Sequence, residues 1–168
     1  MMKHGKAQQT TKPAKEQGAD PFELTRFFPY QLAVLAEQVS LAVAQLYGDR
    51  FNLSRSEWRI LAALGHNGSM TAKELGPYST LDKMQVSRAV AGLEEAGYIA
   101  REEDASDRRA KILQLTKAGQ ALYRKLVPLV VEREQLILDA LESDDLAALA
   151  RIMERLQTRA DSLSKDQA

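Results

Sequence analysis

The sequence predicts a mainly α-helical protein with one small antiparallel β hairpin, and three observations support this fold class. Apolar residues recur at three- and four-residue spacing over most of the chain, with clear runs at 32–46 and 121–163. In three places a Ser, Thr or Asp is followed three residues later by Glu or Gln, which is the pattern of a reciprocal helix cap. Two short apolar runs, 98–100 and 112–115, flank a charged, turn-forming segment.

The composition is that of a globular protein and excludes several kinds of site. The chain has 168 residues, and its Lys+Arg and Asp+Glu number 23 each, so nucleic-acid binding would depend on the local placement of charge. The absence of cysteine excludes disulfides, thiolate nucleophiles and Cys-zinc sites. The two histidines, His4 and His66, complete no ligand cluster, so we expect neither a metal nor another cofactor. No apolar run reaches the roughly 18 residues of a membrane span, and we expect a cytoplasmic protein without a membrane partner.

The first 50 residues predict an arm and a long apolar helix. Residues 1–20 are rich in Lys, Gln, Thr and Gly and predict a flexible arm, whose lysines either contact a phosphate backbone or are simply solvated. Residues 21–50 carry a helix from about Tyr30 to Tyr47, which Gly48 ends. Helices this apolar near a terminus often pair with another chain or with the far end of their own, so we expect a dimerisation helix.

Residues 51–116 predict a helix-turn-helix followed by a hairpin. The first helix of this segment ends at 65–68, a short second helix is ended by Gly76 and Pro77, and a third helix is ended by Gly97. The three capping pairs are Ser54 with Glu57, Thr71 with Glu74, and Asp82 with Gln85. In a helix-turn-helix the short helix braces the next one across a DNA groove.

The helix at 82–97 has the properties of a recognition helix. Its packing face carries Val86, Ala89, Val90 and Leu93. Its outward polar side chains crowd into the first two turns, where a helix inserted end-first into the major groove meets bases and phosphates. Arg88 is the leading candidate for base readout, because a guanidinium can pair bidentately with guanine. The alternative is an ordinary amphipathic surface helix.

The two strands at 98–100 and 112–115 form a wing behind the helix-turn-helix. Arg108 and Arg109 lie at or near its tip, where an arginine can enter a narrow minor groove. A solvated hairpin tip is the alternative, and the carboxylates at 102–104 favour it because they would repel phosphate. We prefer a division of labour in which the arginines face the DNA and the carboxylates orient them.

Residues 117–168 predict two further helices. Thr116 caps the first, and Pro128 should bend or locally break it. Ser143, followed by two aspartates, starts the second. That helix carries a heptad-like apolar seam: Leu146, Leu149, Met153, Leu156, Ala160 and Leu163. The seam either packs within the chain or forms a two-fold dimer, and we prefer the dimer because the winged segment already uses its own apolar residues.

Three strings of this chain resemble the MarR family of bacterial transcription regulators. They are SEWRILAAL at 56–64, LDKMQVSRAVAGLEEAGYI at 81–99 and DASDRRAKILQLTKAG at 104–119. The family's wing signature is an Asp, one residue, an Arg, then a strand that ends in Leu-Thr with a Gly three residues later. The residues that meet it are Asp107, Arg109, Leu115, Thr116 and Gly119. The resemblance covers roughly residues 22–163.

The resemblance implies a homodimeric repressor or activator that dimerises through its first and last helices and binds a pseudo-palindromic operator in double-stranded DNA. It implies base- or phosphate-facing roles for Lys83, Met84, Gln85, Ser87 and Arg88, with Arg109 in the wing. Many members release DNA when a small aromatic acid or another amphipathic compound binds between the dimerisation helices and the winged segment. Four aromatic residues either line such a crevice here or are plain core residues: Phe27, Phe28, Tyr30 and Trp58.

Two other functions compete with this one. An enzyme would need a nucleophile or an acid–base pair in a pocket, but the carboxylates occupy capping positions or charged faces and neither histidine has a recognisable partner. We therefore expect no catalytic residues. The second alternative is a winged-helix module that acts mainly through a protein partner, whose binding would not depend on salt as phosphate contacts do.

Overall fold

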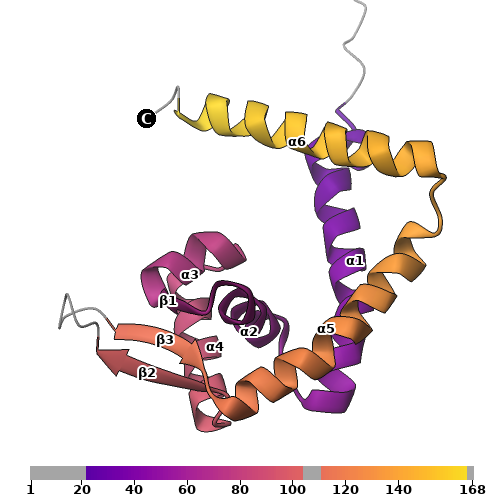
Figure 1. The fold of residues 1–168 in the computed structure, drawn as a ribbon. Helices are drawn as coiled ribbons and strands as arrows, with labels where there is room; N and C mark the ends of the chain where they lie inside the picture. Colours follow the sequence, from indigo (N-terminus) through magenta and orange to yellow (C-terminus); the bar gives the residue numbers. More distant parts are fainter. Residues whose placement is uncertain (1–21, 104–110, 166–168) are drawn as a thin grey trace, which may run out of the picture. The chain divides into compact units, whose positions relative to one another are not determined.

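The computed structural model describes residues 22–103 and 111–165 (Figure 1). The elements, in chain order, are η1 (Leu24–Arg26), α1 (Phe28–Phe51), α2 (Arg55–Asn67), β1 (Ser69–Thr71), α3 (Ala72–Ser79), α4 (Lys83–Glu95), β2 (Ile99–Glu103), β3 (Lys111–Leu115), α5 (Lys117–Leu138) and α6 (Ser143–Lys165). The predicted fold class, mainly α-helical with a small antiparallel sheet, is confirmed. Clustering of contacts divides the chain into two compact units, residues 1–35 and residues 36–168.

The described part of the first unit is short and presents aromatic side chains. The rings of Phe22 and Phe27 meet edge to face, with centroids 5.4 Å apart. Phe27, Phe28 and Tyr30 are all exposed. This segment therefore carries apolar surface that its own unit does not cover.

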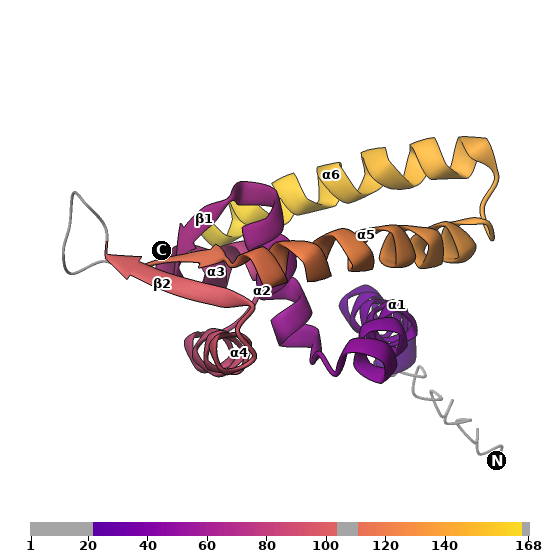
Figure 2. The same cartoon turned by 60° about the horizontal axis from the view of Figure 1, so that its bottom comes forward.

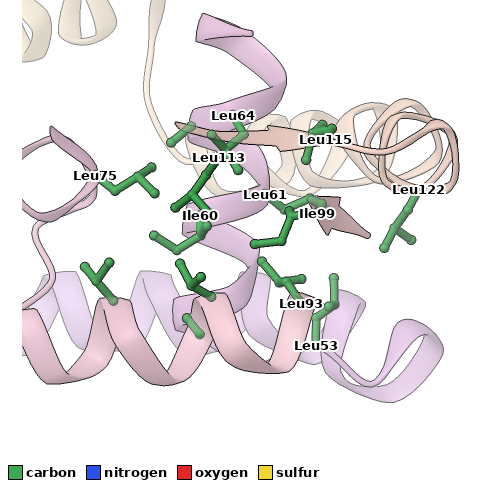
Figure 3. Packing of buried hydrophobic residues seen from close by; sticks show 14 of the residues in the cluster. Leu53, Ile60, Leu61, Leu64, Leu75, Leu93, Ile99, Leu113, Leu115 and Leu122 are labelled. Carbon is green, nitrogen blue, oxygen red and sulfur yellow. The ribbon is translucent and has the colours of Figure 1, made fainter. Parts of the chain in front are cut away.

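The second unit is built around one apolar core to which α2, α3, α4, α5 and the sheet all contribute (Figure 3). From α2, Ile60 and Leu61 are fully buried. The whole predicted packing face of α4 is buried: Val86, Ala89, Val90 and Leu93. Its burial leaves the opposite face of α4 in water, so the predicted amphipathic division of this helix is confirmed.

The three predicted capping boxes are all present and fix where the helices of this unit begin. In α2 the Glu57 N–H donates to the Ser54 hydroxyl, while the Ser54 N–H donates to the Glu57 carboxylate at 2.7 Å. The equivalent reciprocal pairs at the starts of α3 and α4 are Thr71 with Glu74 and Asp82 with Gln85. Gly97 takes a left-handed conformation (φ 74°) just past α4, as predicted.

Two of the predicted helix ends are wrong. The helix α1 continues through Gly48 to Phe51 and ends where Asn52 takes the left-handed conformation (φ 51°). The helix α3 continues through Gly76 and Pro77 to Ser79, and Thr80 is the left-handed residue (φ 55°). Neither glycine has a positive φ, and proline is compatible with helical φ and removes only one N–H, so these residues did not have to stop a helix.

The sheet has a strand that the sequence did not reveal. The strand order is β1-β3-β2, with Met70 of β1 and Arg101 of β2 both paired with Leu113 of β3. Figure 1 labels the three strands and shows β2 and β3 side by side. The two predicted strands correspond to β2 and β3. The third, β1, has only three residues and is defined by its pairing with the distant β3, so no local pattern marks it.

The last two helices follow the prediction except at Pro128. The Thr116 hydroxyl accepts from the Gly119 N–H at 3.1 Å and caps α5, and α6 begins at Ser143. Pro128 does not break α5, which runs without interruption from Lys117 to Leu138. None of the residues of α6 that the structure describes is buried.

Two glycine substitutions should have opposite effects on stability. A Cβ on Gly119 would lie 2.0 Å from the carbonyl oxygen of Tyr98, so Gly119→Ala should destabilise the protein by about 1–3 kcal/mol through overpacking. A Cβ on Gly48 would meet nothing closer than 3.9 Å within a continuous helix, so Gly48→Ala should stabilise it by roughly 0.5–1 kcal/mol. Urea unfolding of both variants at one protein concentration measures the two changes, and a stabilised Gly119→Ala variant would contradict the packing described.

Candidate nucleic-acid interface

The outward face of α4 is polar and cationic in its first two turns. Lys83, Met84, Ser87 and Arg88 are exposed, with Met84 at 68% of its full accessibility. Figure 2 looks along the axis of this helix. The structure therefore brings four of the five predicted contact residues of the helix together on its free face.

Gln85 differs from the other four candidates on α4. It is half-buried, and its side-chain oxygen accepts the Asp82 N–H at 3.0 Å to complete the capping box. Its side-chain oxygen is thus already engaged in fixing the start of the helix, and only its NH₂ group remains for another partner.

A groove of about 960 Å³ runs beside the exposed face of α4, between α3, α4 and β2. Its lining includes Pro77, Leu81, Val86 and Val90, which form an apolar floor. Lys73 and Lys83 line the same groove and give it positive charge, and Arg101 also lines it. Because the chain is neutral overall, it can bind a polyanion only where cations are gathered locally. The groove beside α4 is such a place.

Arg101 of β2 makes a bidentate ion pair with Glu94 of α4. Its Nε and Nη2 lie 2.6 Å from the two carboxylate oxygens. The hydrogen bond from Arg101 holds the pKa of Glu94 below its ordinary value, against a small opposing effect of burial, with help from the charges of Arg101 and Lys111. The carboxylate is therefore ionised at neutral pH and ties the strand of the wing to the recognition helix.

The tip of the predicted wing lies outside the residues that the structure describes. Arg108 and Arg109 both fall in the segment 104–110. The strands on either side are described, and β2 pairs with β3 from Ile99 with Leu115 to Glu103 with Lys111. The pairing confirms the two strands of the predicted wing.

The four aromatic candidates for ligand binding have different environments. The ring of Trp58 stacks on Tyr47 with centroids 5.7 Å apart and an interplanar angle of 23°, and it packs against the core of the second unit. Trp58 is therefore half-buried and in contact with the core, and its role in ligand binding stays a prediction. Phe27, Phe28 and Tyr30 belong to the first unit, where they are exposed.

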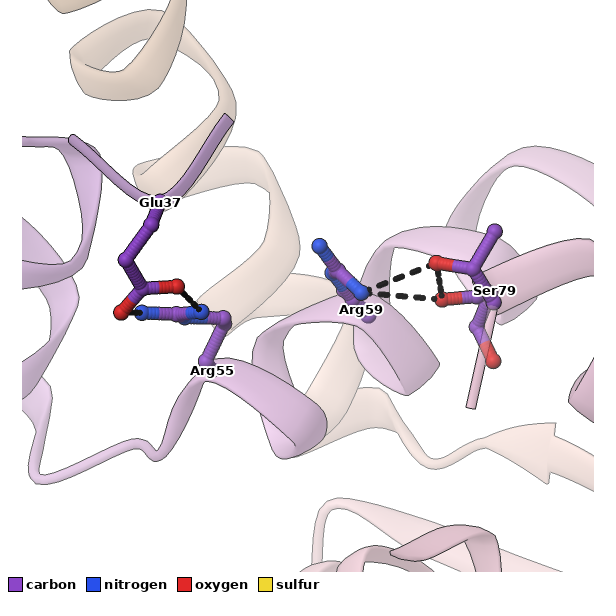
Figure 4. A network of polar contacts seen from close by, with 5 residues as sticks. Glu37, Arg55, Arg59 and Ser79 are labelled. Atoms are coloured by element: carbon purple, nitrogen blue, oxygen red, sulfur yellow. Dashed lines mark hydrogen bonds and ion pairs between the residues drawn. The ribbon is translucent and has the colours of Figure 1, made fainter. Parts of the chain in front are cut away.

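Two arginines of α2 make polar contacts that the sequence did not reveal (Figure 4). Arg55 donates to both carboxylate oxygens of Glu37 in α1, at 2.7 and 2.9 Å. Arg59, one turn later, donates to the Ser79 carbonyl and the Thr80 hydroxyl at the end of α3. These partners lie 18 to 21 residues away in the sequence. The sequence therefore shows that the two arginines are four residues apart, but it does not show their partners.

The described residues show no other kind of site. Among residues 22–103 and 111–165, no group of three or more His, Asp or Glu side chains is placed to hold a metal ion. Within the same ranges, no helix combines the length and apolar character that a membrane span requires.

Comparison with known sequences relates the chain to transcriptional regulators. Residues 51–110 match the profile of the MarR family. The regulator FarR of Neisseria gonorrhoeae is 26% identical over 113 residues, which cover 67% of this chain and 77% of FarR. The uncharacterised regulator YwoH of Bacillus subtilis is 33% identical over 95 residues, which cover 56% of this chain and 69% of YwoH. The homoprotocatechuate degradative operon repressor of Escherichia coli is 25% identical over 117 residues, which cover 70% of this chain and 79% of the repressor.

Solved structures give the same relation. A MarR/EmrR family regulator from Acinetobacter sp. ADP1 aligns with a TM-score of 0.76 and 28% identity, over 84% of this chain and 99% of that one. Bordetella bronchiseptica BpsR, whose DNA binding is regulated by 6-hydroxynicotinic acid, aligns with a TM-score of 0.73 and 20% identity over 82% and 98% of the two chains. S. aureus MepR, solved as a DNA complex, aligns with a TM-score of 0.71 and 18% identity over 79% and 98%.

Proposed function

The chain belongs to the MarR family of transcriptional regulators, a non-enzymatic class whose members bind DNA, and from this premise we propose that it is a homodimeric, sequence-specific repressor. In this proposal α4 enters the major groove of a pseudo-palindromic operator and the wing reaches the neighbouring minor groove. A small aromatic or amphipathic ligand releases the DNA. As a regulator of chromosomal genes, the protein acts in the cytoplasm.

The observation that carries the proposal is the two-sided character of α4. One face is committed to the core, and the other presents Lys83, Met84, Ser87 and Arg88 to solvent in the first two turns. The major groove of DNA admits an α-helix, and the N-terminal residues of the inserted helix then lie closest to the base edges. We assign Arg88 to a guanine and Lys83 to the phosphate backbone.

The wing adds a second set of contacts in this proposal. Arg108 and Arg109 lie outside the described residues, between β2 and β3 in the sequence, and β2 is tied to α4 through Arg101 and Glu94. A narrow minor groove has an enhanced negative potential that attracts arginine. We assign Arg108 and Arg109 to this groove, beside the site of α4.

A homodimer is supported by apolar surface that the single chain leaves exposed. On α6 the neighbouring Ile152 is exposed, as is the whole predicted seam: Leu146, Leu149, Met153, Leu156, Ala160 and Leu163. Several large apolar residues at 28–41 are exposed in the same way. Contiguous apolar surface of this kind marks an interaction site, and a two-fold dimer would match a pseudo-palindromic operator.

An aromatic acid is the proposed effector class. The DNA binding of the fold relative BpsR is regulated by 6-hydroxynicotinic acid, and a sequence relative in Escherichia coli is a repressor of an aromatic degradation operon. In this chain Phe27, Phe28 and Tyr30 are exposed and offer aromatic surface. Trp58 contributes less to the proposal because it is half-buried and stacks on Tyr47, which leaves it less free aromatic surface.

Replacing Arg88 tests the reading face. Arg88→Ala should cost roughly 1–3 kcal/mol of specific affinity and relax the preference at one position of each half-site. The measurement is a salt-dependent binding titration on a duplex that the wild-type protein enriches from a random library. Arg124→Ala, which removes an equally exposed arginine from α5, is the matched control and should change affinity less than about twofold. Failure to enrich any duplex, or binding that ignores salt, would favour a protein partner over DNA.

A charge on the α6 seam tests the dimer. Leu156→Asp should yield a monomer at micromolar concentration, because it would bury an unpaired carboxylate in the proposed interface. Thr158→Asp places the same charge on the opposite, polar face of α6 and should leave the dimer intact. Sedimentation equilibrium distinguishes the two states. A wild-type protein that is monomeric in this concentration range would refute the proposed assembly.

A ligand titration tests the effector class. Hydroxylated aromatic acids, beginning with 6-hydroxynicotinic acid, should include one that weakens operator binding about tenfold, a coupling of about 1.4 kcal/mol. By linkage the same compound must bind the free protein about tenfold more tightly than the DNA complex, which calorimetry on both forms measures. Cyclohexanecarboxylate, which has the charge but not the aromatic ring, is the control. Equal affinity of every acid for the two forms would contradict the proposed release.

A further inference from the structure

We propose that Arg59 is a positioning residue for DNA binding: it fixes the turn between α3 and α4 and so sets the angle at which α4 presents its outer face. The inference rests on the proposed function, since it assumes that α4 is the element that meets DNA. Arg59 itself lies on α2, and it is half-buried and directed at this turn (Figure 4). Its role is therefore to hold the backbone and not to contact the nucleic acid.

The contacts of Arg59 converge on two consecutive residues of the turn. Its Nη1 donates to the Thr80 hydroxyl at 2.9 Å and to the Ser79 carbonyl at 3.3 Å. The Thr80 hydroxyl donates in turn to the same Ser79 carbonyl at 2.7 Å. One guanidinium nitrogen, one hydroxyl and one carbonyl thus form a closed triangle of hydrogen bonds at the end of α3, of which the two from the guanidinium are charge-assisted.

This turn needs an external support because its own conformation is strained. Thr80 is β-branched and has φ 55°, in a region that such residues rarely adopt. Only Thr80, Leu81 and Asp82 separate the last residue of α3 from the first of α4. A change of the backbone angles at Thr80 would swing the whole of α4 relative to α3, because so few residues could absorb it.

The backbone bonds of the turn close the end of α3 as a Schellman-type cap. The Leu81 N–H donates to the Gly76 carbonyl at 3.1 Å, and the Thr80 N–H donates to the carbonyls of Gly76 and Pro77, the latter at 3.4 Å. The side chain of Arg59 adds the contact that comes from outside the α3–α4 unit.

The helix that carries Arg59 is well anchored. The two residues after it, Ile60 and Leu61, are completely buried in the core. One turn earlier, Arg55 is paired through both oxygens with Glu37 of α1. Arg59 thus extends from a helix fixed on two sides to the one strained residue of the DNA-reading segment, so it can transmit the position of α2 to α4.

The test compares Arg59→Met with Thr80→Val and with the double variant. Thr80→Val keeps the shape of the side chain and removes the hydroxyl that Arg59 contacts. Each single variant should bind the enriched operator duplex about tenfold more weakly, and the double variant should be no weaker than either, because all three lose the same interaction. Arg124→Met, which removes an exposed arginine of α5, is the control for loss of charge and should bind like the wild type.

Salt dependence separates positioning from direct contact. A residue that contacts a phosphate contributes about 0.9 to the slope of log affinity against log salt, so loss of such a contact makes the slope shallower. Arg59→Met should weaken binding and leave the slope unchanged. A shallower slope, affinity within about twofold of the wild type, or losses that simply add in the double variant would each overturn the inference.

Hydrogen exchange supplies a readout without DNA. In Arg59→Met the amides of Thr80 and Leu81 should exchange faster than in the wild type, while core amides of α2 keep their protection. Unchanged exchange at the turn would overturn the inference even if the proposed function holds. If the wild-type protein enriches no DNA, the proposed function fails, and faster exchange at the turn would still show that Arg59 positions α4. Thr80→Val keeps the test decisive if Arg59→Met does not fold.

Discussion

The close packing of α4 against α2 is the constraint on which the rest of the structure depends. Val86, Ala89, Val90 and Leu93 are buried against a core that includes Ile60 and Leu61. Gly92 lies where α4 faces Glu57 of α2, since a Cβ there would meet the end of the flexible Glu57 side chain. With one face of α4 committed to the core, its polar residues can only face water or a partner, and the wing strand that follows is placed beside them.

A buried face fixes how α4 rotates about its own axis and limits its tilt, but does not fix where the helix begins. The capping box of Asp82 and Gln85 fixes the first turn, so Lys83 to Arg88 occupy the end of the helix. Contacts at the two ends of the segment add to the packing. At one end Arg59 holds the left-handed Thr80, and at the other Glu94 pairs with Arg101 of β2. Both contacts are made by arginines that reach a neighbouring element through a planar, multidentate group.

The sequence predicted those features that depend on local chemistry. The capping boxes, the apolar face of α4 and the left-handed Gly97 each follow from residues within one or two turns, and each is confirmed. The ends of α1 and α3 were wrong because glycine and proline permit a helix to stop without requiring it. The strand β1 and the partners of Arg59 and Arg101 could not be predicted, because their counterparts lie elsewhere in the chain and only the fold brings them together. The roles of Arg88 and Arg109 at DNA remain predictions, since no DNA contact is described.

The neutral composition explains why a dimer suits this recognition surface. With Lys+Arg and Asp+Glu equal in number, the protein as a whole does not attract a polyanion, and the cations near α4 and the groove offer only a small set of contacts per chain. Joining two such surfaces makes the second binding step intramolecular, which raises affinity without any new contact when the spacing matches the operator. The distance and angle between the two DNA-binding surfaces then control the affinity as strongly as the contacts themselves. In the proposed function, a ligand that changes this geometry by binding near the proposed dimerisation helices would therefore release DNA without touching α4, so separate effector and DNA-binding surfaces are compatible in one small protein.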